Sequence, residues 1–119
     1  MSKSILIVDD SRVAREVIKE FLSSEAVKIS EAANGKEALS HLQQNYVDLI
    51  ICDLNMPQMN GLELIKNIKS SDKLSSIPIA LITSESSFES LDKAKKMGVI
   101  AFLVKPVTED QISTLLGII

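Results

Sequence analysis

Strand-like and helix-like segments alternate along the whole chain, and this alternation is the strongest constraint on its fold. The strand-like segments are residues 5–8, 27–30, 47–52, 79–82 and 101–104. Most of them are nearly continuous apolar runs, which is typical of strands covered on both faces. Parallel strands cannot be joined by hairpins, so the connecting helices must cross over the sheet. The sequence therefore predicts a doubly wound α/β domain with three layers.

Helical periodicity marks the segments between these strands. In residues 11–23, Val13, Val17 and Phe21 recur at helical spacing while the charged residues fall elsewhere. Similar patterns predict helices over residues 36–44, 62–68, 88–98 and 108–116. One helix thus follows each strand.

Polar residues follow four of the five strand-like segments. In chain order they are Asp9, Asp10, Asp53, Thr83 and Lys105, and Pro106 follows Lys105. In open doubly wound sheets the functional crevice lies outside the carboxyl ends of the strands. Three carboxylates, a hydroxyl and an ammonium group are therefore expected to converge on one crevice.

The expected cluster of carboxylates has a definite chemistry. Three ionised carboxylates repel one another, so the cluster either holds a proton at a raised pKa or recruits a cation. Oxygen ligands and open coordination positions suit Mg²⁺. Zinc is not expected, because Cys52 should point away from Asp53 in a strand and His41 lies in the second helix.

A carboxylate beside a metal, a hydroxyl and a lysine suits phosphoryl transfer. Asp53 ends the longest central run and is the expected nucleophile, with an acyl phosphate as its product. Asp9 and Asp10 would then hold the ion. Thr83 and Lys105 would each contact a phosphoryl oxygen.

The chain resembles the receiver domains of two-component response regulators, and in particular the stand-alone chemotaxis regulators. The resemblance extends over nearly the whole chain and rests on residues 5–10 (ILIVDD), residues 53–64 (DLNMPQMNGLEL), Thr83-Ser84 and Lys105-Pro106. It implies a flavodoxin-like (βα)5 fold with strand order 2-1-3-4-5. It also implies that residues 1–119 form a single receiver domain.

The resemblance implies roles for the residues of the crevice. Asp53 would accept a phosphoryl group from a histidine kinase or a histidine phosphotransfer protein. Mg²⁺ would be surrounded by Asp9, Asp10, Asp53 and the backbone carbonyl of Asn55, with Asp10 and Asp53 as the main direct carboxylate ligands. The peptide bond between Lys105 and Pro106 would be cis.

The family's switch implies further roles. Thr83 would move toward the phosphoryl group, and Phe102 would turn inward and reshape the surface of the fourth helix, fifth strand and fifth helix. A downstream protein would bind this surface, and the chain would be a monomer or a phosphorylation-dependent dimer. Many members have tyrosine where this chain has Phe102, so the ring is kept without its hydroxyl. Asn55 and Glu85 occupy the positions that influence dephosphorylation.

Other interpretations of the same residues remain open. The Asp9-Asp10 pair could cap the helix that follows. A flavin mononucleotide module shares the architecture, but it needs a phosphate-cradling loop where this chain has two aspartates. A metal-dependent phosphatase would need an acid/base carboxylate beside Asp53 and a cap over its substrate. An interaction module without phosphorylation would not require the five polar residues. The chain could also be the receiver part of a longer regulator with a DNA-binding or enzymatic output domain.

Composition narrows the classes of partner. The formal net charge of −3 gives no basic field that would attract nucleic acid or an anionic membrane. No run of about 18 apolar residues is present to cross a bilayer. We expect a cytoplasmic protein that neither binds nucleic acid directly nor inserts into a membrane.

Overall fold

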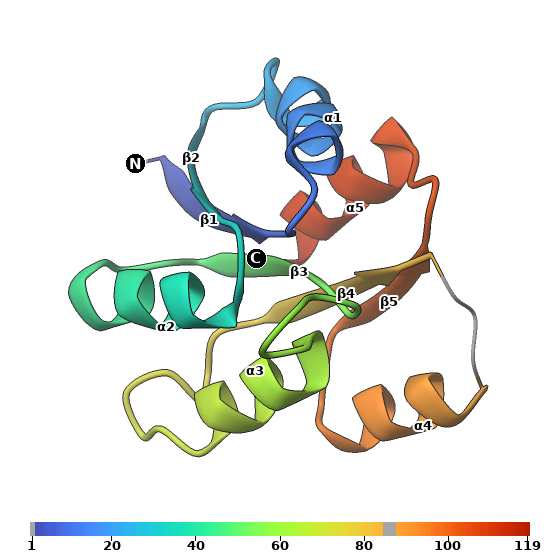
Figure 1. Cartoon of the computed structure of the whole chain (residues 1–119). Helices are drawn as coiled ribbons and strands as arrows, with labels where there is room; N and C mark the ends of the chain where they lie inside the picture. Colours follow the sequence, from blue (N-terminus) through green and yellow to red (C-terminus); the bar gives the residue numbers. More distant parts are fainter. Residues whose placement is uncertain (1, 85–87) are drawn as a thin grey trace.

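The computed structural model, described here over residues 2–84 and 88–119, contains a five-stranded parallel sheet between two layers of helices (Figure 1). The strands are β1 (Lys3–Val8), β2 (Val27–Ala32), β3 (Leu49–Asp53), β4 (Ile79–Thr83) and β5 (Ala101–Val104). The helices are α1 (Arg12–Leu22), α2 (Gly35–Gln44), α3 (Gly61–Lys69), α4 (Phe88–Lys96) and α5 (Glu109–Ile118). The strand order is β2-β1-β3-β4-β5, which confirms the predicted fold.

The two faces of the sheet carry separate cores. On one face, Leu6 and Ile50 pack against α2, α3 and α4, and on the other Ile7 and Ile51 pack against α1 and α5. β1, β3 and β4 are buried on both faces, as their continuous apolar runs predict. Figure 1 shows α1 and α5 together on one side of the sheet and the other three helices on the opposite side. The residues at the ends of the central strands are therefore attached to the buried core.

Polar side chains define where several helices begin. The side chains of Ser11, Asn34, Asn60 and Thr108 each accept a hydrogen bond from a backbone N–H in the first turn of the following helix. Such N-caps satisfy N–H groups that have no partner inside the helix. Ser11, and not the Asp9-Asp10 pair, is thus the N-cap of α1.

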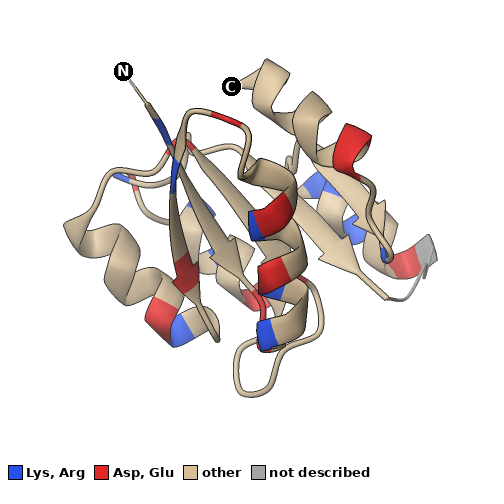
Figure 2. Ribbon diagram, turned by 90° about the horizontal axis from the view of Figure 1, so that it is seen from above, with Lys and Arg blue, Asp and Glu red and all other residues tan. Residues whose placement is uncertain are grey.

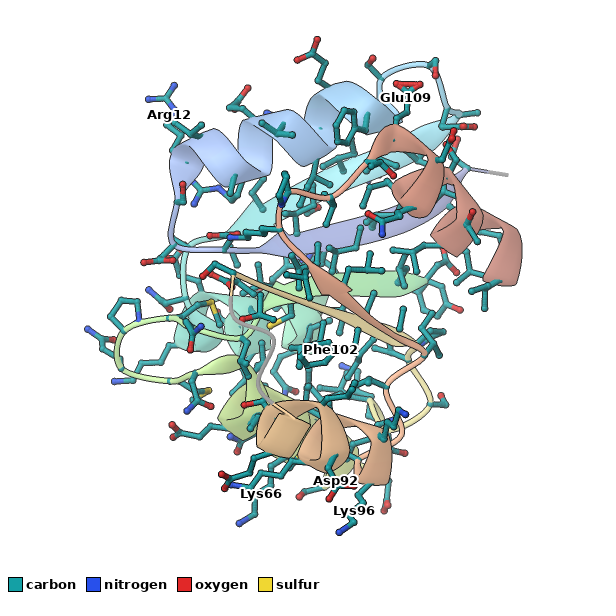
Figure 3. All side chains as sticks on the ribbon, turned by 90° about the vertical axis from the view of Figure 1, so that its right-hand side faces the viewer. Arg12, Lys66, Asp92, Lys96, Phe102 and Glu109 are labelled. Atoms are coloured by element: carbon teal, nitrogen blue, oxygen red, sulfur yellow. The ribbon has the colours of Figure 1, made fainter. Side chains whose placement is uncertain are left out.

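The outer surface of α4 has mixed charge. Lys93 Nζ lies 3.3 Å from Glu89 Oε1, and Lys96 Nζ lies 3.0 Å from Asp92 Oδ2. Figure 3 shows Asp92 and Lys96 on the side of α4 away from the sheet, and Figure 2 shows acidic and basic residues interspersed on the helices. Along residues 2–84 and 88–119 no helix combines the length and apolar character needed to cross a membrane.

Gly61 lies where the loop after β3 turns into α3, and a side chain there would strike the backbone. A Cβ atom on Gly61 would lie 2.6 Å from the carbonyl oxygen of Asp53 and 2.9 Å from the Cα atom of Leu54. We expect Gly61→Ala to lower the free energy of unfolding by about 2–3 kcal/mol, as overpacking of a buried site does. Urea denaturation would measure this change.

Gly117 provides the matched control for that substitution. A Cβ atom on Gly117, within α5, meets nothing within 4 Å. Gly117→Ala should therefore raise the stability by about 0.5–1 kcal/mol through helix propensity. Equal effects of the two substitutions would contradict the close approach at Gly61.

Candidate functional site

The carboxyl ends of β1, β3, β4 and β5 lie along one edge of the sheet. Asp53 is the last residue of β3 and Thr83 the last of β4, while Asp9 and Lys105 directly follow β1 and β5. The parallel register places Thr83 opposite Val104, the residue before Lys105. Strand pairing alone thus brings together residues from four distant parts of the sequence.

The three predicted carboxylates form one cluster. Asp9, Asp10 and Asp53 each offer an oxygen, and these oxygens lie within 4.8 Å of one another. Asp9 and Asp53 are 2% and 6% exposed, whereas Asp10 is exposed. The cluster is therefore open to solvent on the side of Asp10.

Lys105 supplies a positive charge to this cluster. Its Nζ atom lies 2.9 Å from Asp9 Oδ2 and 3.7 Å from Asp53 Oδ2. Burial lowers the pKa of Lys105, but the hydrogen bond to Asp9 and the charge of Asp53 outweigh it and raise the pKa above its usual value. Lys105 is consequently an ammonium ion throughout the physiological pH range.

Asp53 is held in an environment that disfavours its charge. Burial and the negative charge of Asp9 raise the pKa of Asp53 to about 6, even though Lys105 lowers it. The backbone N–H of Asn55 donates only a long hydrogen bond of 3.4 Å to Asp53 Oδ1. Asp53 is therefore a weakly solvated carboxylate whose negative charge an incoming cation would stabilise.

The oxygen atoms of the cluster differ in how they are already bonded. Asp9 Oδ1 accepts a hydrogen bond of 2.9 Å from the backbone N–H of Ser11, and Asp9 Oδ2 accepts one from Lys105. Both oxygens of Asp9 are thus engaged, while the contacts to Asp53 are long. An all-oxygen set with several negative charges fits a hard divalent cation such as Mg²⁺.

The remaining predicted residues surround this cluster. Asn55 Nδ2 lies 3.3 Å from the buried Thr83 Oγ1, so it donates a hydrogen bond to the hydroxyl. Phe102 is partly buried on the face of the sheet that α4 covers (Figure 3). The peptide bond between Lys105 and Pro106 is cis. Glu85 lies outside the described residues.

One residue beside the site has no place in the sequence-based prediction. Arg15 Nη1 donates a hydrogen bond of 2.6 Å to the backbone carbonyl oxygen of Asp9. Arg15 lies among the charged residues of a helix with a clear apolar face, so its spacing indicates only a solvated position. The one signal available was its distance of a single helical turn from the N-cap Ser11.

Comparison with known proteins assigns the family. The sequence model of the response regulator receiver domain family matches residues 5–116 of this chain. The chain belongs to the response regulator receiver family. It is 41% identical over 106 residues to chemotaxis protein CheY1 of Helicobacter pylori, covering 87% of this chain and 86% of that protein. It is 37% identical over 105 residues to chemotaxis protein CheY-3 of Vibrio cholerae, covering 87% of this chain and 81% of that protein.

Solved structures give the same assignment for this receiver. The structure of chemotaxis protein CheY4 of Vibrio cholerae superposes with a TM-score of 0.91 at 32% identity and covers 98% of both chains. Receiver domains of response regulators work as phosphorylation switches in two-component systems, between histidine kinases or phosphotransfer proteins and downstream targets. This receiver therefore has the same general function.

Proposed function

We propose that this receiver accepts a phosphoryl group on Asp53 from the phosphohistidine of a histidine kinase or phosphotransfer protein, and that residues 1–119 act as one domain. The observation that supports the proposal is the convergence of Asp53, Lys105 and the other two carboxylates at one sheet edge. Within receivers, a buried carboxylate beside an ammonium group is suited to form an acyl phosphate.

The transfer exchanges one bond to phosphorus for another. A carboxylate oxygen of Asp53 attacks phosphorus in line, the P–N bond of the phosphohistidine breaks, and its electron pair stays on the imidazole nitrogen. Lys105 Nζ, only 3.7 Å from Asp53 Oδ2, is placed to pair with a phosphoryl oxygen. The hydroxyl of Thr83, which accepts a hydrogen bond from Asn55 Nδ2, would donate to another phosphoryl oxygen. These two residues position the phosphoryl group.

The carboxylate cluster gives the proposed metal site, with Asp10 and Asp53 as direct ligands, Asp9 behind them and the Asn55 carbonyl as a further ligand. Bound Mg²⁺ would neutralise charge on the phosphoryl oxygens. Asp9 holds Lys105 in place through the 2.9 Å ion pair. The exposure of Asp10 leaves the cluster accessible to an entering ion.

Intact mass spectrometry tests the proposal. Incubation with a small acyl phosphate and Mg²⁺ should add one phosphoryl group, and peptide mapping should locate it on Asp53. Chelation of the divalent cation should stop the reaction. No added phosphoryl group in the presence of donor and Mg²⁺ would overturn the proposal. A phosphoryl group on Asp48, an aspartate whose Oδ2 accepts a hydrogen bond from the backbone of Ser4, would also contradict it.

The proposed output surface consists of α4, β5 and α5. Thr83 and Phe102 lie on adjacent strands, and Phe102 faces the side of the sheet that α4 covers. Movement of Thr83 toward a phosphoryl group would open space next to the partly buried ring, which could then turn inward. The reshaped surface would bind a downstream protein, or a second copy of the chain in a phosphorylation-dependent dimer.

Thr83→Ala should separate phosphorylation from this switch. The variant should still accept a phosphoryl group, because the nucleophile is Asp53 and Thr83 only links the phosphoryl group to the switch. The NMR shifts of Phe102 and α4 on addition of a phosphoryl mimic should be less than about half those of the wild type. Shifts of equal size in both proteins would contradict the coupling.

Asn55 and Glu85 are proposed to orient the water that hydrolyses the acyl phosphate. Asn55 is exposed beside Asp53 and Thr83, so its side chain lies at the rim of the site. Replacement by larger side chains, in Asn55→Arg with Glu85→Tyr, should obstruct the in-line path of water and slow decay several-fold. The decay of phosphorylated protein after donor removal measures this rate, and an unchanged rate would rule the two positions out.

A further inference from the structure

The side chain of Arg15 joins helix α1 to strand β2 and to the turn that carries Asp9. From α1, its Nη1 atom donates to the carbonyl oxygen of Asp9 at 2.6 Å, and its Nε atom donates to Glu31 Oε1 on β2 at 3.0 Å. The side chain is only 15% exposed. Both bonds use adjacent nitrogen atoms of one planar guanidinium group, so they fix its orientation.

The hydrogen bond from Arg15 is one of several that hold Asp9 in the turn between β1 and α1. The backbone N–H of Asp9 donates to the carbonyl of Ala32 at 3.1 Å, which extends the pairing of β1 with β2 by one residue. Asp9 Oδ1 accepts from the N–H of Ser11 at 2.9 Å. The carbonyl oxygen of Asp9 accepts a hydrogen bond from Arg15, and this carbonyl belongs to the peptide group that links Asp9 to Asp10.

We propose that Arg15 is a positioning residue for the carboxylates of Asp9 and Asp10, and that it sets the affinity of the site for divalent cations. The guanidinium group anchors the peptide between the two residues and thereby fixes the direction in which each carboxylate points. Groups that orient metal ligands without touching the metal commonly change metal affinity by about 10–100-fold. This inference rests on the proposed cation site.

The ion pair with Glu31 reduces the contribution that the charge of Arg15 makes to the carboxylate cluster. Burial raises the pKa of Glu31, but hydrogen bonds from Arg15 and Lys19 outweigh it and hold the pKa below its usual value. Glu31 is therefore a carboxylate between Arg15 and Lys19, and its negative charge offsets part of theirs. What remains specific to Arg15 is its planar pair of donors.

A cation titration of four proteins tests the proposal. Mg²⁺ is added to wild type, Arg15→Gln, Arg15→Lys and Glu31→Gln, and the amide NMR shifts of Asp9, Asp10 and Ser11 are followed without any phosphoryl donor. Both Arg15 variants should bind Mg²⁺ about 10–100-fold more weakly. Lysine should not rescue the affinity, because a single ammonium cannot reproduce both bonds. Glu31→Gln should weaken binding to a smaller extent, since Arg15 keeps its bond to Asp9.

Lys19→Gln is the matched control. Lys19 Nζ lies 3.2 Å from Glu31 Oε2, so this variant removes a positive charge from the same carboxylate without a bond to Asp9. Its Mg²⁺ affinity should stay within about twofold of wild type. In the metal-free proteins, the Asp9 and Asp10 amide shifts should change in Arg15→Gln and not in Lys19→Gln.

The outcomes separate the two proposals. Wild-type affinity in Arg15→Gln, or full rescue by Arg15→Lys, would overturn the positioning role while leaving the proposed function intact. Absence of Mg²⁺ binding by the wild type would instead overturn the cation site itself. If Arg15→Gln does not fold, as circular dichroism would show, the comparison of Arg15→Lys with wild type decides the matter.

Discussion

Asparagine in place of Asp53 should abolish phosphorylation and, in the absence of metal, make the protein more stable. The first effect follows because an amide is not a nucleophile toward phosphorus, so no phosphoryl group should be detectable after the same incubation. The second follows from the raised pKa of Asp53, about 6 in the folded protein against an ordinary value of 3.8. A group that binds its proton more tightly when folded opposes folding once that proton is lost.

The sign and size of this stability effect follow from linkage. As pH rises through the window from the unfolded to the folded pKa of Asp53, the folded state loses stability. Above that window the ionised carboxylate costs about 1–3 kcal/mol, at 1.36 kcal/mol for each unit of pKa difference. Urea denaturation at pH of about 7.5 with a chelator should therefore show Asp53→Asn more stable by this amount. Mg²⁺ should reduce the difference, because the wild type has one more carboxylate to bind it and is stabilised more.

Asp48→Asn is the control for the loss of one negative charge. Asp48 lies away from the cluster, and its Oδ2 atom accepts a hydrogen bond of 2.7 Å from the backbone N–H of Ser4. This substitution should not stabilise the protein and should leave phosphorylation unchanged. A metal-free Asp53→Asn protein no more stable than the wild type would show that the carboxylates of the cluster do not strain the fold.

Phosphorylation should slow roughly tenfold for each unit that the pH falls below the pKa of Asp53, which is about 6 without a bound cation, because only the carboxylate form attacks phosphorus. Lys105 lowers the pKa of Asp53, so Lys105→Gln should move the midpoint of this profile to higher pH. Protons and cations compete for the same oxygens, so saturating Mg²⁺ should move the midpoint to lower pH.

Initial rates measured by mass spectrometry at constant ionic strength would define these profiles. The phosphoryl donor also titrates, but its pKa does not depend on which protein is present. A difference in midpoint between wild type and Lys105→Gln therefore reflects the pKa of Asp53. Coincident midpoints in the two proteins would mean that Lys105 does not act on the charge of Asp53.

The sequence predicted the arrangement of strands well because burial on both faces leaves a long apolar run. Its limits are visible at β3, which was expected over residues 47–52 and runs over Leu49–Asp53. Val47 is buried although it precedes the strand, and hydrophobicity cannot distinguish a buried turn from a strand. The backbone of Asp48 already bonds to Ser4, outside the ladder between β1 and β3.

The residue pattern also placed the five polar residues at one edge, but it gave Asp9 and Asp10 the same role, and only the family resemblance distinguished them. In the structure Asp9 is buried with both oxygens bonded, and Asp10 is exposed. This difference depends on the turn that Ser11 and Arg15 form around Asp9, which is a tertiary feature. Arg15 was missed for the same reason, because the helical pattern gives no information about which carbonyl a charged side chain reaches.

The ion pair between Lys105 and Asp9 has a consequence for the order of assembly. Its two residues are 96 positions apart, and it forms only when β5 has docked beside β4. During synthesis, β1 and β3 leave the ribosome long before residue 105, so their carboxylates first meet without this ammonium group. Mutual repulsion then disfavours closure of the sheet edge. The acidic cluster should accordingly be among the last parts of the chain to reach its native form, and an incomplete chain would not yet have a site able to receive a phosphoryl group.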